Sequence, residues 1–294
     1  MTNRAAGKTA IPVVSGEFGF RGEDFEFIAT TLYDEAGIHL APSKANLVYS
    51  RLTKRLRSLG LESFAAYCDL IGSPDGADER AQMIAALTTN VTRFFREPHH
   101  FDHLKHKLLP PLVDAVKKNK SGRIRIWSAG CSSGQEPFSI ALTILSLLPD
   151  ARSFDVKILA TDINPYVLET ARKGLYPEED IDSVPADLRR AWTDPAGGGM
   201  VQMDDGPRSL ITFRPLNLMG HWPMQGPFDA IFCRNVVIYF DEKTQIKMWN
   251  RMSSLLKGNG CLYLGHSERL TGPAEALFKP DGTTTYRKIA GASA

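Results

Sequence analysis

The feature that most constrains this chain is a change of hydrophobic period near residue 120. Before it, from about 23 to 118, apolar side chains recur at the spacing of amphipathic helices, and no stretch alternates as a strand would. From 123 onward, short β-rich runs such as KILATD and FDAIFC are separated by helical stretches. Strands that alternate with helices predict βαβ units and a parallel sheet covered on both faces.

The 294 residues suffice for two domains at ~150 residues each. We expect a flexible tail, an N-terminal helical domain, a linker with a helix, and an α/β domain, over 1–20, 21–90, 91–122 and 123–294. A turn-rich stretch at about 183–214 should form a small insertion with its own strand pairing. Pro110-Pro111 should interrupt a helix that begins at Pro98. A hairpin over 278–289 should turn at Asp281-Gly282.

Composition excludes several classes of protein. Apolar residues make up 43% and charged residues 23%, which is ordinary for a globular chain. The net charge of +2 gives no global attraction to nucleic acid or anionic lipid. The most apolar stretch after the N-terminus, at 140–148, is far too short to span a bilayer, and the N-terminus does not resemble a signal peptide. We therefore expect a soluble, cytoplasmic protein without membrane insertion.

The cysteines predict neither a disulfide framework nor a zinc ribbon, because they are widely spread and form no C-x-x-C pair. They are Cys68, Cys131, Cys233 and Cys261. We expect them to be reduced, and Cys131 and Cys233 to be small packed residues.

Glycines and polar residues follow four of the predicted strands, at the edge where open α/β sheets bind ligands. In chain order they are Gly130 and Gly134, Asp162, Asn217 and Leu218, and Arg234 and Asn235. G-x-x-x-G is neither the dinucleotide fingerprint nor a P-loop, and alone it is more typical of a tight strand–helix turn. Asp162 could accept both hydroxyls of a ribose or could cap a helix. Together these residues favour a nucleoside cofactor without a pyrophosphate, such as S-adenosylmethionine.

Four longer motifs make the interpretation specific. They are TTNVTRFFRE at 88–97, the glycine loop with EPFS at 136–139, CRNVVIYF at 233–240 and GHSE at 265–268. In order and spacing, from about residue 20 to 289, the chain resembles the CheR family of chemotaxis receptor methyltransferases. These enzymes esterify glutamate side chains of methyl-accepting chemotaxis proteins.

The resemblance implies a class I S-adenosylmethionine-dependent methyltransferase domain of Rossmann-like α/β fold. An all-α N-terminal domain would precede it, and a small antiparallel β-subdomain would be inserted in it. S-adenosylhomocysteine would be the product. Beside the glycine loop, the implied cofactor contacts are Asn90, Thr92, Arg96, Glu136, Asp162, Asn217, Leu218, Arg234 and Asn235.

The implied reaction needs little chemistry from the enzyme. A glutamate side chain has a pKa of ~4.3 and is already an anion at neutral pH. Its attack on a sulfonium methyl needs alignment and exclusion of water but no general base. We expect Arg96 to hold a carboxylate and Tyr239 to lie near the transferring methyl, both as positioning groups. The alternatives are a structural ion pair for Arg96 and a packed aromatic ring for Tyr239.

A basic helix could meet the substrate. No Asp or Glu occurs between 36 and 61, and Arg51, Lys54 and Arg55 share one helical face. We expect this face to bind the acidic cytoplasmic helices of a receptor. A solvated basic face is the alternative, and an RNA-binding helix is disfavoured because no aromatic residues are interleaved. We expect no nucleic-acid partner, and nothing demands more than a monomer.

The three histidines His99, His103 and His106 fall on one helical face without an accompanying acid or cysteine. We expect them to pack or to face solvent, with no metal bound. Some family members use the β-insertion to hold a C-terminal receptor peptide, and their loop is longer than 193–200 here. We therefore expect methylation without a tether.

Two other functions stay open. One is a non-catalytic cofactor-sensing module of a chemosensory complex, and the other is a methyltransferase acting on RNA or a small acid. The intact set of polar residues Arg96, Asp162, Arg234 and Tyr239 argues against the first. The helical domain and its basic helix argue against the second.

Overall fold

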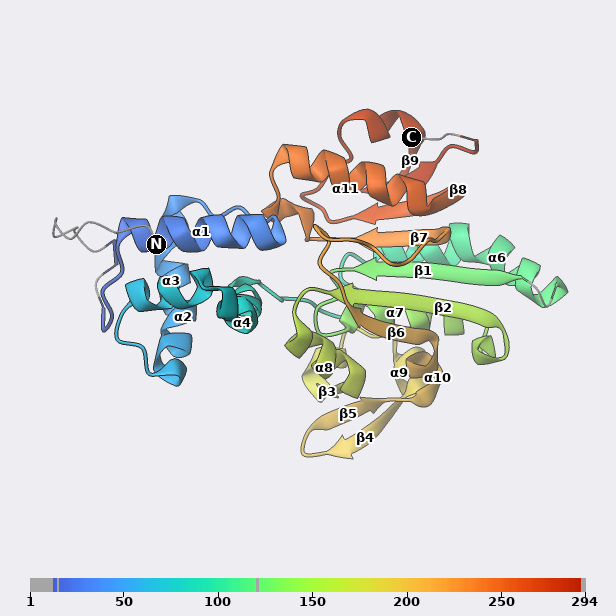
Figure 1. The fold of residues 1–294 in the computed structure, drawn as a ribbon. Coiled ribbons are helices and arrows are strands. Elements are labelled where there is room, and N and C mark those ends of the chain that lie inside the picture. Colours follow the sequence, from blue (N-terminus) through green and yellow to red (C-terminus); the bar gives the residue numbers. More distant parts are fainter. Residues whose placement is uncertain (1–12, 15, 120–121, 292–294) are drawn as a thin grey trace. The chain divides into compact units, whose positions relative to one another are not determined.

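The computed structural model describes residues 13–14, 16–119 and 122–291 (Figure 1). The chain divides into two compact units, residues 1–89 and 90–294. No helix among the described residues is long and apolar enough to cross a membrane.

The first unit is all-helical, as predicted. Its helices are α1 (Gly22–Ala36), α2 (Ala45–Leu59), α3 (Phe64–Gly72) and α4 (Ala77–Leu87), with single turns at η1 (Pro42–Lys44) and η2 (Pro74–Gly76). Gly37 and Gly60 end α1 and α2 in the left-handed conformation, with φ of 70° and 66°. A residue without Cβ adopts this conformation at little cost, which is why these glycines mark the helix ends in the sequence.

The expectation of a loose tail through residue 20 is wrong for its last part. Phe20 is fully buried, and its ring centroid lies 4.3 Å from that of Phe64. The backbone amide of Phe18 donates to the Tyr49 hydroxyl at 3.1 Å. The side chains of Phe18 and Phe20 are both buried and complete the core of this unit, although the small residues around them suggested a tail. Residues 1–12 and 15 lie outside the described part of the chain.

The second unit begins with a helical segment made of α5 (His99–His103), the π-turn η3 (Leu104–Leu108) and α6 (Leu109–Lys118). The predicted interruption is real but displaced, because Pro110 and Pro111 lie in the first turn of α6. A proline there lacks only an N–H that the helix start leaves unpaired. The π-turn before it shifts the ladder, and the Leu109 amide donates to the Leu104 carbonyl.

A seven-stranded sheet forms the centre of the second unit, in the order β6-β2-β1-β7-β8-β10-β9. The strands are β1 (Arg123–Ala129), β2 (Asp155–Asp162), β6 (Ile211–Pro215), β7 (Phe228–Cys233), β8 (Leu256–Leu264), β9 (Phe278–Gly282) and β10 (Thr285–Lys288). The first five run parallel, and β10 is antiparallel to β8. Helices α6 and α7 (Gln135–Leu145) lie on one face and α11 (Glu242–Leu255) on the other (Figure 1).

The inserted subdomain is a three-stranded antiparallel sheet in the order β3-β5-β4. Its strands are β3 (Leu175–Pro177), β4 (Thr193–Gly197) and β5 (Met200–Met203), with η5 (Glu178–Ile181), α9 (Ala186–Trp192) and α10 (Asp205–Leu210) around them. The expected span of 183–214 misses β3 at one end and includes β6 of the main sheet at the other. A three-residue strand directly after α8 (Pro165–Lys173) is too short to show a period of its own.

The C-terminal hairpin of β9 and β10 is confirmed, but its turn is not at Asp281-Gly282. Gly282 pairs with Thr285, so Thr283 and Thr284 form the turn, and Thr284 has a φ of 46°. The carboxylate of Asp281 instead accepts from the Arg287 side chain at 2.6 Å. The short turns η4 (Ala151–Ser153), η6 (Val237–Tyr239) and η7 (Pro273–Leu277) complete the unit.

Candidate active site

The strand order reverses between β1 and β7, which pair in parallel from Ile126 with Ala230 to Ala129 with Cys233. Ligands bind at such a reversal, outside the carboxyl ends of the strands. The loops that leave β1 and β7 here are 130–134 and 234–239. The loops after β2 and β6 open at the same edge, because these strands pair in parallel with β1 and with each other.

The glycine loop after β1 is a turn that only glycine fits. Gly130 and Gly134 have φ of 78° and 99°. A Cβ on Gly130 would lie 2.3 Å from the Val236 side chain, and one on Gly134 would lie 2.7 Å from the Tyr176 hydroxyl. The turn and its packing therefore require both glycines, whatever the loop binds.

Ser132 links three of the predicted cofactor elements. Its amide donates to Asp162 Oδ2 at 2.8 Å, and its hydroxyl donates to the Asn90 carbonyl at 2.8 Å. The Leu216 amide donates to the Asp162 carbonyl at 2.9 Å, which brings the 217–218 loop beside the end of β2. The structure thus brings together the glycine loop, Asn90, Asp162 and the loop after β6.

Asp162 does not cap the following helix. Asn164 is the cap of α8, because its side chain accepts from the Tyr166 amide at 3.0 Å. The Asp162 carboxylate is buried, and each oxygen accepts one backbone amide, from Ser132 and from Asn164. Burial raises the pKa of Asp162, and these amides oppose the shift. The carboxylate has lone pairs beyond those that accept these amides, and they could accept a hydroxyl.

Arg234 is enclosed by protein. Its side chain is 2% exposed, donates to Glu136 Oε2 at 3.1 Å and to the Arg96 carbonyl, and lies 3.4 Å from Glu97 Oε2. The Ser128 hydroxyl donates to Glu136 Oε1 at 2.7 Å. Burial raises the pKa of Glu136, and Arg234 opposes that shift. Through these contacts Arg234 joins the loop after β7 to α7 and to the Arg96 turn.

The Arg96 turn is built from unusual backbone. Phe95 and Glu97 on either side have φ of 49° and 58°, a conformation costing of order 1–3 kcal/mol for a residue with a Cβ. The half-buried Arg96 side chain donates to the Val91 carbonyl at 3.1 Å. Within the described residues it pairs with no acid, so the alternative of a structural ion pair for Arg96 finds no support.

Tyr239 ends the η6 turn after β7 and is half-buried. Its hydroxyl makes no hydrogen bond within the described residues. No hydrogen bond or ion pair joins Tyr239 or Thr92 to the other predicted site residues in that part of the chain.

Glu268 shapes the candidate site, and sequence reasoning assigned it no role. It is buried, and its two oxygens accept the amides of Asn235, Val236, Val237 and Gly265 at 2.6–2.9 Å. Burial raises its pKa, while the four amides oppose the shift. One side chain thus shapes the loop that carries Arg234 and leads to Tyr239. Its only signal in the sequence was membership of the GHSE motif.

The predicted histidine face divides. The expectation that no acid or cysteine accompanies these histidines is wrong, because His103 lies with Cys261 and Asp281, and His99 lies with Glu97. His103 contacts the Tyr263 hydroxyl and Asp281 Oδ2, each at 3.0 Å, so both ring nitrogens are engaged. His99 instead lies with His100 and Glu97, an arrangement whose ligand atoms fall within 4.8 Å of one another. Arg234 lies 3.4 Å from Glu97 there, and this cation opposes a metal ion.

The thiols of Cys131 and Cys233 are buried, and burial raises the pKa of both well above the usual value. They are packed residues, as expected.

Two of the three basic side chains on the predicted face of α2 bind groups of the same helical unit. Arg51 donates to the carbonyls of Leu87 and Thr88 at 2.7 and 3.0 Å, at the C-terminus of α4. Arg55 pairs with Glu79 at 2.5 Å. Sequence spacing placed these arginines on one face but could not reveal their partners. Lys54 is exposed and has no such partner among the described residues.

When its seven strands are numbered along the chain, the main sheet has the order 3-2-1-4-5-7-6. Strand 7, which is β10, runs antiparallel to its neighbour strand 5, which is β8. This order, with a glycine loop after the first strand and an acid after the second, defines a class I methyltransferase domain.

Comparison with known proteins gives the family. Residues 90–287 match the family described as "CheR methyltransferase, SAM binding domain", and residues 23–88 match "CheR methyltransferase, all-alpha domain". The chain belongs to the CheR methyltransferase family, and S-adenosylmethionine is its cofactor.

Individual relatives agree with this family assignment. A probable chemotaxis protein methyltransferase of Rhizobium etli is 52% identical over 87% of this chain and 96% of its own length. Chemotaxis protein methyltransferase 2 of Pseudomonas aeruginosa is 43% identical over 92% and 94%. The solved methyltransferase domain of bacterial CtHen1 is 18% identical over 53% of this chain and 62% of that chain. Its TM-score of 0.29 is too low to carry weight.

The ionisable side chains around the glycine loop suit this cofactor. Counted as ionised, Glu97, Glu136 and Asp162 stand against Arg96 and Arg234, a sum of 2 − 3 = −1, and Glu268 beneath the 235–237 loop adds a further negative charge. S-adenosylmethionine carries a sulfonium, an ammonium and a carboxylate, a sum of 2 − 1 = +1. Glu97 Oε2 is also a buried acceptor without a hydrogen bond within the described residues, an atom that a donor could satisfy.

Proposed function

We propose that this protein transfers the methyl group of S-adenosylmethionine to glutamate side chains of chemoreceptors, forming glutamate γ-methyl esters. The names of the relatives support the class of substrate. The observation that carries the proposal is that three carboxylates of the site already face a donor or a cation, whereas Arg96 has no acidic partner within the described residues and donates to the Val91 carbonyl. Asp162 accepts amides, Glu136 is held by Arg234 and Ser128, and Glu97 lies against Arg234.

Such a site is poorly equipped to deprotonate a nucleophile, and well equipped to place one that is already ionised. When bound, the cofactor supplies an electrophilic methyl group on a sulfonium. Arg96 orients the incoming carboxylate through its planar fork of donors. The Tyr239 hydroxyl lies near the methyl, as a further positioning group. No proton has to move, because the carboxylate enters as an anion and the sulfonium leaves as a neutral thioether.

The cofactor contacts proposed are of two kinds. Asp162 accepts the ribose hydroxyls, and the 217–218 loop with Leu218 and Asn217 borders the adenine. Asn90, Thr92, Arg96, Glu136 and Asn235 surround the methionine part, above the glycines Gly130 and Gly134. Arg234 acts through Glu136 and Arg96.

The receptor's acidic helices are proposed to dock on α2, where Lys54 remains available. Arg51 and Arg55 keep α2 in place, since they hold the end of α4 and Glu79. The turn between β4 and β5 is only Gly198-Gly199, which supports methylation without a C-terminal peptide tether. Receptors with and without their C-terminal residues should therefore be methylated at equal rates.

The reaction is tested with methyl-labelled S-adenosylmethionine and receptor-containing membranes, followed by mild alkali. Label released as volatile methanol is expected, because carboxyl methyl esters hydrolyse in alkali. Alkali-stable label on protein, or label on nucleic acid, would contradict the proposed substrate. Cofactor binding without any transfer, tested with several receptors, would favour the sensing module.

A further inference from the structure

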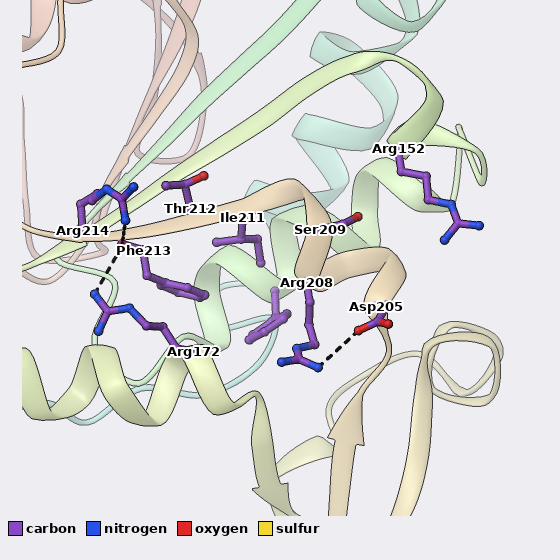
Figure 2. A pocket seen from close by; sticks show the side chains of 10 residues that line it. Arg152, Arg172, Asp205, Arg208, Ser209, Ile211, Thr212, Phe213 and Arg214 are labelled. Atoms are coloured by element: carbon purple, nitrogen blue, oxygen red, sulfur yellow. Dashed lines mark hydrogen bonds and ion pairs between the residues drawn. The ribbon is translucent and has the colours of Figure 1, made fainter.

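A cavity of about 560 Å³ lies at the free edge of the main sheet, beside β6 (Figure 2). It is lined by Phe138, Arg152, Arg172, Asp205, Arg208, Ser209, Ile211, Thr212, Phe213 and Arg214. None of these residues belongs to the proposed cofactor site. The four arginines come from four separate elements: η4, α8, α10 and β6. With one aspartate, the charge of the lining is 4 − 1 = +3.

Two of these arginines share a single acceptor. Arg172 Nη2 and Arg214 Nη1 each lie 3.4 Å from the Phe213 carbonyl, and both guanidinium groups point to it at one end of the cavity (Figure 2). Within the described residues, neither forms an ion pair. Both side chains are exposed, and no hydrogen bond other than those at this carbonyl engages them within the described residues, so most of their donors are available. An anion between them would accept those donors and reduce the mutual repulsion of the two cations, which solvent already screens.

Arg208 extends the positive lining toward the middle of the cavity (Figure 2). It pairs with Asp205 at 3.3 Å, and the side chains of Arg208 and Asp205 are 39% and 86% exposed. Such a surface pair contributes little, so Arg208 can turn toward a ligand at small cost. Arg152 lies at the opposite end (Figure 2). The cations are thus strung along the cavity.

A row of arginines calls for an anion with several charged groups in sequence. Guanidinium forks match phosphate oxygens in pairs, and the Thr212 hydroxyl in the lining can donate to such an oxygen. The volume lies within the usual range for small-ligand sites. We propose that this cavity binds an oligophosphate, either free or as the di- or triphosphate of a nucleotide. This proposal holds whether or not chemoreceptors are the substrate of the methyltransferase.

The test is calorimetric titration of the full chain with pyrophosphate, ADP and inorganic phosphate. Saturating S-adenosylhomocysteine is present throughout, so that nucleotides cannot occupy the cofactor site. Pyrophosphate is expected to bind more tightly than phosphate, and its affinity should fall as salt is raised. Equal affinity for pyrophosphate and ADP would indicate recognition of the phosphates alone. Tighter ADP binding would indicate a nucleotide.

Two variants locate the site. Arg172→Gln and Arg214→Gln should each weaken pyrophosphate binding roughly tenfold, the effect of losing a charged hydrogen bond. Arg190→Gln removes an exposed arginine of α9 outside the cavity and should change nothing. Unchanged S-adenosylhomocysteine affinity confirms that the variants fold. Absence of pyrophosphate and ADP binding at millimolar concentration would overturn the proposal. So would equal weakening by Arg190→Gln, or binding of single-stranded RNA in preference to pyrophosphate.

Discussion

A single buried carboxylate can organise an active-site loop, and Glu268 does so here. Four amides converge on it, three of them from consecutive residues after β7. An amide group in its place would accept at one oxygen and present an N–H₂ to the remaining donors. The shape of the loop that positions Tyr239 therefore depends on the negative charge of Glu268.

Glu268→Gln should lower both stability and methyl transfer. Unsatisfied buried amides cost ~1–3 kcal/mol, which urea unfolding would detect. At saturating cofactor and receptor, kcat should fall because Tyr239 loses its position. Glu275→Gln, at an exposed glutamate of η7, is the matched control and should leave both quantities unchanged. Wild-type kcat in Glu268→Gln would show that the loop holds its shape without the charge.

Substitution of Asp162 tests its proposed contact with the ribose of the cofactor. Asp162→Asn keeps the shape and one acceptor for the neighbouring amides, whereas Asp162→Ala also releases the Ser132 amide. We expect the asparagine variant to bind S-adenosylhomocysteine at least about tenfold more weakly, as the loss of a charged hydrogen bond implies. Asp155→Asn, at the exposed start of the same strand, should bind normally. Calorimetry showing unchanged affinity in Asp162→Asn would remove Asp162 from the cofactor site.

For single residues, the sequence predicted which ones directly follow a strand, because this depends only on the neighbouring residues in the chain. It did not predict their partners. Arg51 and Arg55 fall on one face by spacing, yet the α4 terminus and Glu79 engage them. Arg234 follows β7, but its burial against Glu136 could not be predicted from its position. Tertiary partners come from segments distant in the chain, and periodicity carries no information about them.

Among the elements, the glycine loop joins strand β1 to helix α7, and Gly134→Ala should disrupt it. The new Cβ would adopt a φ of 99° and lie 2.7 Å from the Tyr176 hydroxyl and 2.9 Å from Ala171 Cβ. Backbone strain and overpacking of ~1–3 kcal/mol each should add in the free energy of unfolding. Gly197→Ala, at a φ of 80° with open space around it, shows the strain alone. Equal destabilisation of both variants would contradict the steric part.

The elements also show where sequence reasoning stops. The helices ending at Gly37 and Gly60 were predicted from a helical period and clear ends, and the strands of the main sheet from short β-rich runs between helical stretches. The three-residue strand β3 was missed, and the hairpin turn was placed at Asp281-Gly282 on composition. The Arg287 side chain binds Asp281 and the turn falls at Thr283 and Thr284, a preference that the turn sequence alone does not show.

On the scale of the whole methyltransferase unit, His100 connects segments far apart in the chain. Its Nε2 lies 3.2 Å from the Thr283 carbonyl and 2.9 Å from the Thr284 hydroxyl, in the turn of the C-terminal hairpin. Because a carbonyl only accepts, Nε2 carries the proton and Nδ1 does not. Burial and then the nearby Arg234 lower the pKa of His100 from 6.5 to about 3. The neutral ring is thus part of the native fold.

This shift predicts a loss of stability in acid. Between pH 6.5 and about 3, the unfolded chain binds a proton at His100 that the folded chain does not, so stability falls as the pH falls. At pH 5.5 the loss relative to pH 7.5 is ~1.4 kcal/mol. The raised pKa values of Glu136, Asp162 and Glu268 act in the opposite direction, since their folded forms take up protons first. The contribution of His100 must therefore be measured as a difference between variants.

His100→Gln removes the titrating group but keeps a donor for the Thr283 carbonyl. Urea unfolding of this variant and the wild type at pH 7.5 and 5.5 isolates the effect, because all other groups titrate in both proteins. The drop in unfolding free energy between the two pH values should be ~1.4 kcal/mol smaller in His100→Gln. His221→Gln, at an exposed histidine, should retain the wild-type drop. Equal drops in all three proteins would mean that His100 titrates normally and that the hairpin turn is open to water.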